Sequence, residues 1–224
     1  REDRLGPERA CAQGWISPRA MRNGIIVTVL FACLIGSALL FYAGWELIIV
    51  GLLCVLFAFL YTTGPYPLSY NGWGDVLVIV FFGFVPVGGT YYVQALTWTS
   101  DTTVASLICG LLIDTLLVVN NYRDREADAR SGKRTVIVRF GEKFGRYLYL
   151  MLGVAASLLC FWFFFEGHLF AALLPLLYLI PHVLTWRRMV QIHSGKKLNS
   201  ILGETSRNML LMGILLSIGF LIRH

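Results

Sequence analysis

The sequence contains few charged residues, and this scarcity excludes an ordinary water-soluble domain. Charged residues make up 14% of the 224 residues and hydrophobic residues make up 57%, whereas soluble domains carry about 25% charged residues. The five cysteines form no CxxC pair and the four histidines are dispersed, so the sequence offers no zinc-binding pattern. No low-complexity linker or soluble domain interrupts the chain, and we expect residues 1–224 to form one transmembrane domain.

Long apolar stretches fill most of the sequence. Each has about the 17–25 residues that a helix needs to cross the hydrocarbon core of a bilayer. A single soluble domain could not bury so many apolar helices. The sequence therefore predicts an all-α polytopic membrane protein with seven transmembrane helices, at about residues 24–43, 46–63, 75–96, 103–122, 147–165, 168–186 and 205–222.

The basic residues predict how the chain is oriented in the membrane. Eighteen of the 19 Lys and Arg lie in residues 1–22, 123–146 and 187–207. By the positive-inside rule, these segments are cytoplasmic. The net charge of +6 is then mainly a topology signal and secondarily an attraction to anionic lipid headgroups. We expect membrane lipid around the chain and no nucleic-acid partner.

The fourth apolar stretch ends in a polar segment that contains Asn120, Asn121, Asp124 and Asp128. On a helix, Asn121, Asp124 and Asp128 lie within about 60° of each other. Asp114, deeper in the same stretch, projects close to Asn121, which indicates a polar stripe that descends into the bundle. Clustered carboxylate and amide oxygens are ligands that Mg²⁺ prefers, and Mg²⁺ commonly binds together with substrate phosphates.

Cations follow these acids after a turn at Ser131 and Gly132. Lys133, Arg134 and Arg139 could supply the positive charge that a bound diphosphate requires. Two simpler interpretations remain open at this point. The acids could form a solvated helix end that neutralises neighbouring arginines, and some of the cations could serve only as the topology signal.

A loop rich in Pro, Gly and aromatic residues precedes the third apolar stretch. It covers residues 64–75 and directly follows the second stretch, which contains Tyr61 near its end. The loop could be an aromatic turn at the membrane interface, or it could form a rigid wall whose aromatic faces stack on a ring or face a cation.

At these residues the chain resembles the UbiA-type intramembrane prenyltransferases. The matching segments are NNYRDREADARSGKRTVIVRFGE (120–142), TGPYPLSYNGWGDV (63–76) and, more weakly, REDRLGPERA (1–10). The resemblance covers essentially the whole chain. It implies a nine-helix bundle, of which this chain resembles the last seven helices, and two Asp-rich motifs that hold a Mg²⁺-bound prenyl diphosphate.

The resemblance also implies roles for individual residues. Asp124 and Asp128 form the second Asp-rich motif and bind the metal, and Tyr61 supplies an aromatic face near the reacting carbon. The expected substrate-binding residues are Asn120, Asn121, Lys133, Arg134 and Arg9. The family's first motif, of N-x-x-x-D type, is expected upstream of Arg1, and without it we expect the 224 residues alone to be inactive.

The first two segments together favour the branch of the family whose aromatic acceptor is 1,4-dihydroxy-2-naphthoate, used in menaquinone synthesis. That branch releases CO₂ and diphosphate and acts at the cytoplasmic face of the bacterial inner membrane. Other acceptors of the family, namely 4-hydroxybenzoate, homogentisate and haem, remain alternatives. A transporter with an acidic path is a weaker alternative, because polar residues thin out beyond Asp114 toward the outer face.

Overall fold

The computed structural model describes residues 5–6 and 8–222. All regular secondary structure in that part of the chain is helical. Six helical segments there are long and apolar enough to cross a membrane, and a further apolar helix, α3 (Glu46–Thr62), has 17 residues. The prediction of an all-α polytopic membrane protein is confirmed. The six are Pro18–Phe41, Gly74–Ala95, Ser100–Arg130, Glu142–Phe165, Leu169–Ile192 and Leu198–Leu221.

These segments are built from shorter elements that join end to end. The first combines α2 (Pro18–Ala38) with η1 (Leu39–Phe41), and a short helix α1 (Ala10–Gln13) precedes it. The third predicted span combines α4 (Gly74–Val78), the π-helix η3 (Ile79–Gly88) and α5 (Gly89–Ala95). The remaining elements are η2 (Leu68–Tyr70), α6 (Ser100–Arg130), α7 (Val136–Phe140), α8 (Glu142–Leu159), α9 (Trp162–Phe165), α10 (Leu169–Leu173), η4 (Leu174–Tyr178), α11 (Leu179–Ile192) and α12 (Leu198–Leu221).

Two helices extend well beyond the apolar stretches from which they were predicted. Helix α6 continues eight residues past the end of the apolar stretch at 122, so that Asp124 and Asp128 lie on the same helix as Asn121. Helix α12 begins at Leu198, seven residues before the predicted start, because Leu198 and Ile201 are fully buried there. Apolar content alone marks the part of a helix that lies in lipid, and it misses turns that continue into the polar region.

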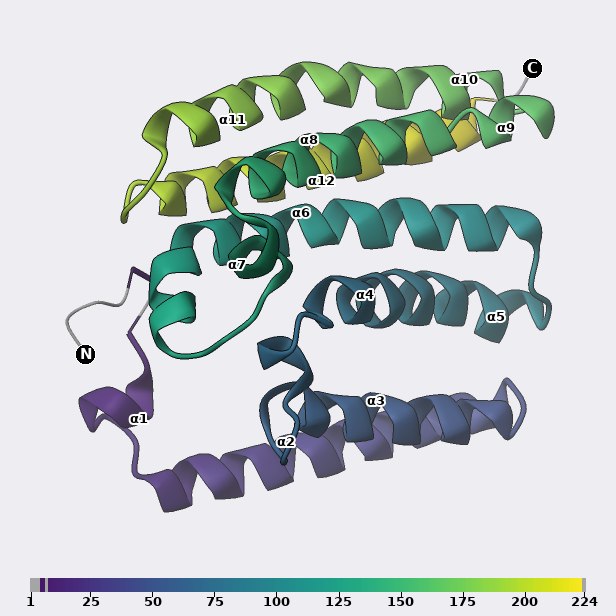
Figure 1. Cartoon of the computed structure of the whole chain (residues 1–224). Coiled ribbons are helices and arrows are strands. Elements are labelled where there is room, and N and C mark those ends of the chain that lie inside the picture. Colours follow the sequence, from purple (N-terminus) through teal and green to yellow (C-terminus); the bar gives the residue numbers. More distant parts are fainter. Residues whose placement is uncertain (1–4, 7, 223–224) are drawn as a thin grey trace.

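Helix α6 lies in the middle of the molecule. Figure 1 shows α2 and α3 along one edge, then α4 to α5, then α6, with α8, α11 and α12 beyond it. The two buried clusters of apolar side chains lie between α6 and the C-terminal helices. By contrast, α2 and α3 contain no buried residue, as expected for helices whose side chains face lipid.

The contact between α6 and η3 depends on glycine. A Cβ atom added at Gly83 would lie 2.5 Å from the carbonyl oxygen of Ser106, and one added at Gly110 would lie 2.9 Å from that of Ile79. Small residues let helix backbones approach closely in membranes. This close approach fixes the face of α6 that carries Asp114 and Asn121 against η3 and α4.

Candidate functional site

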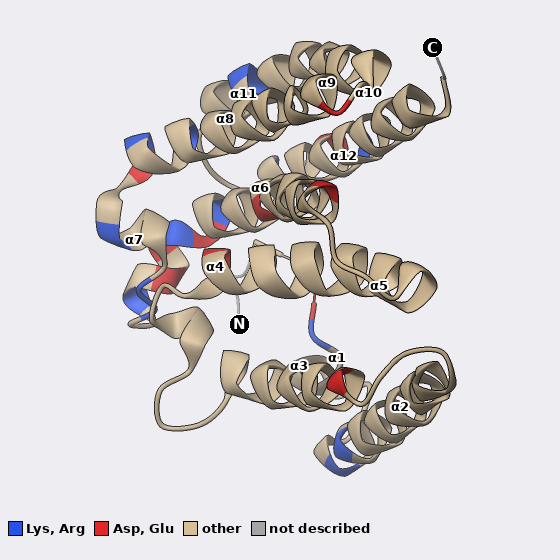
Figure 2. Ribbon diagram, turned by 90° about the vertical axis from the view of Figure 1, so that its right-hand side faces the viewer, with Lys and Arg blue, Asp and Glu red and all other residues tan. Residues whose placement is uncertain are grey.

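The candidate site lies at the polar end of α6. Figure 2 shows many of the acidic and basic residues gathered at the end of the bundle that contains α7. Asn121 is buried, with 6% of its surface exposed, whereas the side chain of Asp124 is 32% exposed and that of Asp128 is 14% exposed. The acids therefore lie at the rim of the bundle while the amide lies just inside it.

Asp128 and Lys133 form an ion pair across a tight turn. The Lys133 ammonium donates to an Asp128 carboxylate oxygen at 3.1 Å. Gly132 has φ of +76°, a conformation that favours glycine, and the Lys133 amide donates to the Asp128 carbonyl at 2.9 Å. The Ser131–Gly132 turn predicted from the sequence thus folds the lysine back beside the acid.

The aromatic loop lies directly against the segment that carries the cations. The Arg134 amide donates to the carbonyl oxygen of Tyr70 at 2.7 Å, and the Arg139 guanidinium donates to that of Asn71 at 2.7 Å. The side chains of Arg134 and Arg139 are exposed. Two segments about 60 residues apart in the sequence therefore form one wall beside the acids.

A second acidic group lies deeper, where α3, α4 and α6 meet. Asp114 is 1% exposed, and one carboxylate oxygen of Asp114 and one of Asp75 are buried without a hydrogen-bond partner. The Tyr61 hydroxyl from α3 lies 3.5 Å from the position that a Cβ atom on Gly74 would occupy, and the Leu117 side chain from α6 lies 3.2 Å from the same position. The prediction that Asp114 faces the bundle interior agrees with this burial.

Not every predicted site residue joins this arrangement through its side chain. The Asn120 amide donates to the Leu116 carbonyl one turn earlier, at 3.2 Å. Arg9 is exposed, and its side chain forms no hydrogen bond or ion pair with any residue that the structure describes. The substrate-binding roles of these two residues stay predictions.

Two residues at the site were not selected by the sequence analysis. Arg123 is 6% exposed and donates to both carboxylate oxygens of Asp124, but in the sequence it appeared only as one cation among many. Asp75 was treated as the end of the aromatic loop. Asp75 could have been found from the sequence, because a charged residue at the start of a 22-residue apolar segment indicates a functional role.

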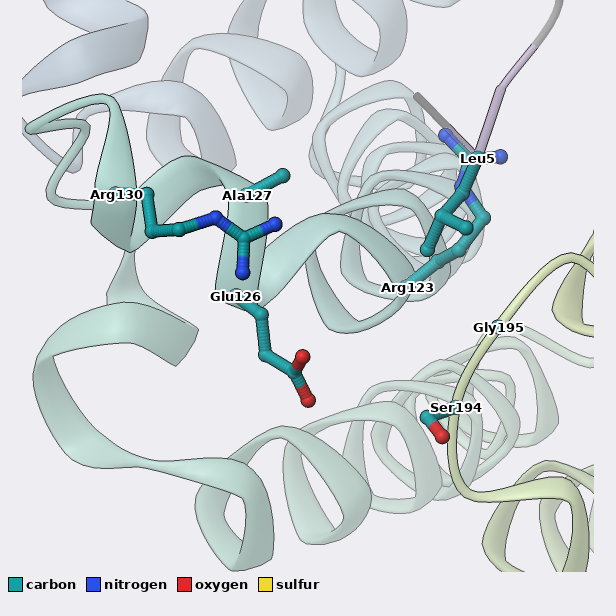
Figure 3. A pocket seen from close by; sticks show the side chains of 7 residues that line it. All are labelled: Leu5, Arg123, Glu126, Ala127, Arg130, Ser194 and Gly195. Atoms are coloured by element: carbon teal, nitrogen blue, oxygen red, sulfur yellow. The ribbon is translucent and has the colours of Figure 1, made fainter. Parts of the chain in front are cut away.

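A pocket with several polar residues lies on a neighbouring face of α6. It has a volume of about 310 Å³ and is shown in Figure 3. On a helix, Arg123, Glu126, Ala127 and Arg130 share a face that is distinct from the one carrying Asp124 and Asp128. The pocket lining consists of Leu5, Arg123, Glu126, Ala127, Arg130, Ser194 and Gly195.

A protein-family model matches the sequence that carries these acids, cations and aromatic residues. The model of the UbiA prenyltransferase family matches residues 1–217. The chain belongs to the UbiA prenyltransferase family. The match includes the acidic end of α6, the aromatic loop and every apolar helix up to most of α12.

Curated relatives narrow the similarity within this family. A protein of Haemophilus influenzae is 37% identical over 99% of this chain, and the alignment covers 74% of that protein. A protein of Escherichia coli is 38% identical over 70% of this chain and 53% of its own length, and one of Mycobacterium tuberculosis is 38% identical over 71% and 55%. All three are named 1,4-dihydroxy-2-naphthoate octaprenyltransferase.

The chain spans about half the length of the Escherichia coli and Mycobacterium tuberculosis relatives. No solved structure matches it significantly. The roles of individual site residues in this UbiA family member are therefore inferred from the geometry described above.

Proposed function

We propose that this chain acts as a membrane prenyltransferase that joins a polyprenyl group to 1,4-dihydroxy-2-naphthoate. One observation carries the proposal. Asp124 and Asp128 lie on one face of α6 at the rim of the bundle, next to Lys133 and the aromatic loop. The similarity to three proteins named as octaprenyltransferases for this acceptor supports the choice of substrate.

The acids at the end of α6 suit a hard divalent cation. Mg²⁺ is typically bound by one or two carboxylates together with substrate phosphates and water, rather than by a complete protein cage. No group of three or more Asp, Glu, His or Cys side chains gathers within residues 5–6 and 8–222, and two acids are sufficient for this mode of binding. Asp124 and Asp128 would hold Mg²⁺, which when bound would neutralise the diphosphate and make it a better leaving group.

The residues around these acids have separate tasks in the proposal. Lys133, paired with Asp128, can turn its ammonium toward a phosphate oxygen and share the negative charge that develops on the diphosphate. Arg134 is held through its backbone at the same wall and carries an exposed guanidinium. Asn121 adds a buried amide beside the acids, and the Tyr61 ring supplies an aromatic face for the allylic cation.

The reaction that these groups would support balances without an added redox partner. The bond between the allylic carbon and the diphosphate oxygen breaks, and the electron pair leaves with diphosphate. An electron pair of the naphthalene ring forms the new carbon–carbon bond. The bond between the ring and its carboxylate then breaks, so that CO₂ leaves and its electron pair restores the aromatic ring.

A location inside the membrane fits the polyprenyl substrate. An apolar cleft of about 420 Å³ lies between α2 and α3 and is lined by side chains such as Val29 and Val55. A prenyl chain can occupy apolar surface of this kind without first entering water. The cations gathered at the acidic end of α6 support an active site at the cytoplasmic face of a bacterial inner membrane.

The other candidate functions have less support. Acceptors such as 4-hydroxybenzoate, homogentisate or haem would use the same diphosphate site, but the relatives described above carry names specific for the naphthoate. A transporter would require a polar path through the membrane. Membership in a prenyltransferase family and the apolar half of α6 before Asp114 both argue against one.

The proposal is tested in membranes that contain the intact protein, supplied with radiolabelled octaprenyl diphosphate and one acceptor at a time. We expect labelled lipid product with 1,4-dihydroxy-2-naphthoate and Mg²⁺. Asp124→Ala and Asp128→Ala should each lower turnover by roughly 100-fold or more, because the negative charge that develops on the diphosphate would no longer be neutralised by a bound cation. Turnover at the wild-type rate in either variant, or product only with another acceptor, would refute the corresponding part of the proposal.

A further inference from the structure

Arg123 is nearly buried beside one of the proposed metal ligands. Its Nε donates to one carboxylate oxygen of Asp124 at 2.8 Å, and its Nη2 donates to the other at 2.7 Å. The Arg123 side chain is 5% exposed. This two-pronged contact is the strongest geometry available to an arginine and a carboxylate, and it fixes the plane of the carboxylate.

Arg123 is itself held in place by two other parts of the chain. Its Nη1 donates to Oδ1 of Asn199 at 2.8 Å, and the Asn199 side chain donates in turn to the carbonyl oxygen of Leu5 at 3.0 Å. Gly6 packs so closely on the guanidinium that an added Cβ would lie 3.1 Å from Nη2. Figure 3 shows the Arg123 side chain extending toward Leu5.

Asn199 lies in the first turn of α12. It follows Leu198, the first residue of α12, which is fully buried in the apolar cluster between α6 and α12. The contacts from Leu5 through Asn199 and Arg123 to Asp124 therefore form a continuous chain of hydrogen bonds. This chain connects the N-terminal segment and α12 to one carboxylate at the end of α6.

We propose that Arg123 is a positioning residue that orients the Asp124 carboxylate for binding a divalent cation. The inference rests on the proposed function. Each carboxylate oxygen can accept two hydrogen bonds or ligand contacts. Arg123 uses one position on each oxygen and leaves the other position open. Partners that orient a ligating carboxylate commonly contribute about 10–100-fold to metal affinity.

Two other roles for Arg123 make different predictions. If Arg123 only neutralised Asp124, it would compete with the cation, and its removal would strengthen metal binding. If Arg123 were a phosphate contact, its removal would raise the KM for prenyl diphosphate and leave metal affinity unchanged. A positioning role predicts weaker metal binding when Arg123 is removed, and neither alternative predicts this result.

The test measures Mn²⁺ binding to the purified intact protein by electron paramagnetic resonance of the free ion, which does not depend on turnover. Arg123→Gln and Arg123→Lys should each weaken Mn²⁺ binding by about 10–100-fold. The lysine keeps the charge but loses the two-pronged geometry. Asn199→Ala, which leaves both Arg123 and Asp124 present, should weaken binding by a smaller factor and covers the case in which the Arg123 variants fail to fold.

Arg125→Lys is the matched control. Arg125 lies two residues away on α6, donates to Glu142 and to the Tyr122 carbonyl, and should not affect Mn²⁺ affinity. Wild-type or tighter binding in Arg123→Gln and Asn199→Ala, with binding lost in Asp124→Ala and Asp128→Ala, would overturn the role of Arg123 but leave the metal site intact. Wild-type binding in Asp124→Ala and Asp128→Ala would instead overturn the metal site on which the proposed function depends.

Discussion

At the scale of single residues, the sequence indicated which side chains carry charge but not how they pair. The spacing of Asn121, Asp124 and Asp128 predicted a common helix face, and the sequence placed Lys133 after a turn at Ser131 and Gly132 without indicating its ion pair with Asp128. The pairing of Arg123 with Asp124 could not be predicted, because it depends on Asn199 and Leu5, which are far away in the sequence. The catalytic roles of these residues stay predictions.

Lys133 offers a residue-scale test of the diphosphate site. Lys133→Met should raise the KM for prenyl diphosphate by roughly 10–100-fold, because removing one charge-assisted hydrogen bond costs about 1.5–3 kcal/mol. The KM for the aromatic acceptor should stay unchanged, and Lys133→Arg should restore most of the loss. Steady-state kinetics with each substrate varied in turn makes the measurement. An equal change in both KM values would argue against a phosphate contact.

Asp114 offers a second test at this scale. One of its carboxylate oxygens is buried without a partner, and natural proteins retain such groups mainly where function requires them. Asp114→Asn should therefore raise the thermal unfolding temperature of the purified protein, because a buried ionisable group near Asp75 is removed. Glu166→Gln, which removes an exposed acid, is the control and should leave this temperature unchanged. A lower unfolding temperature for Asp114→Asn would contradict the interpretation.

At the scale of elements, all seven predicted helical segments exist, but their ends were predicted less well. The apolar stretches found the parts of α6 and α12 that lie among other apolar groups. They missed the last turns of α6, where Asp, Glu and Arg residues replace the apolar ones while the backbone stays helical. They also gave no sign of the π-helix η3, which contains Pro86 and packs closely against α6.

Helix packing between α6 and η3 is tested by adding a methyl group. Gly83→Ala would place a Cβ 2.5 Å from the Ser106 carbonyl oxygen and should lower the unfolding free energy by about 1–3 kcal/mol. Gly213→Ala is the matched control, since a Cβ there meets no atom within 4 Å. The unfolding free energy of Gly213→Ala should equal or slightly exceed that of the wild type. Equal stability of the two variants would show that the helices can separate without cost.

At the scale of the whole molecule, composition and the distribution of charge were sufficient to predict a multi-pass helical membrane protein. The central position of α6, with α2 and α3 along an edge, could not be predicted from hydropathy, because the mean hydropathy of its span, 2.1, lies inside the range of 1.2 to 2.6 that the six spans cover. It follows from long-range contacts in which α6 packs against η3, α8 and α12. The candidate site occupies the polar end of this central helix, where the elements on both sides converge.

The most direct test of the account is a structure of the intact protein with Mn²⁺ and a non-hydrolysable prenyl thiodiphosphate. The anomalous scattering of manganese locates the ion without reference to activity. We predict an ion bound by the carboxylates of Asp124 and Asp128, with the diphosphate between this ion and Lys133. An ion bound elsewhere, with both acids turned toward bulk water, would contradict the proposed diphosphate site.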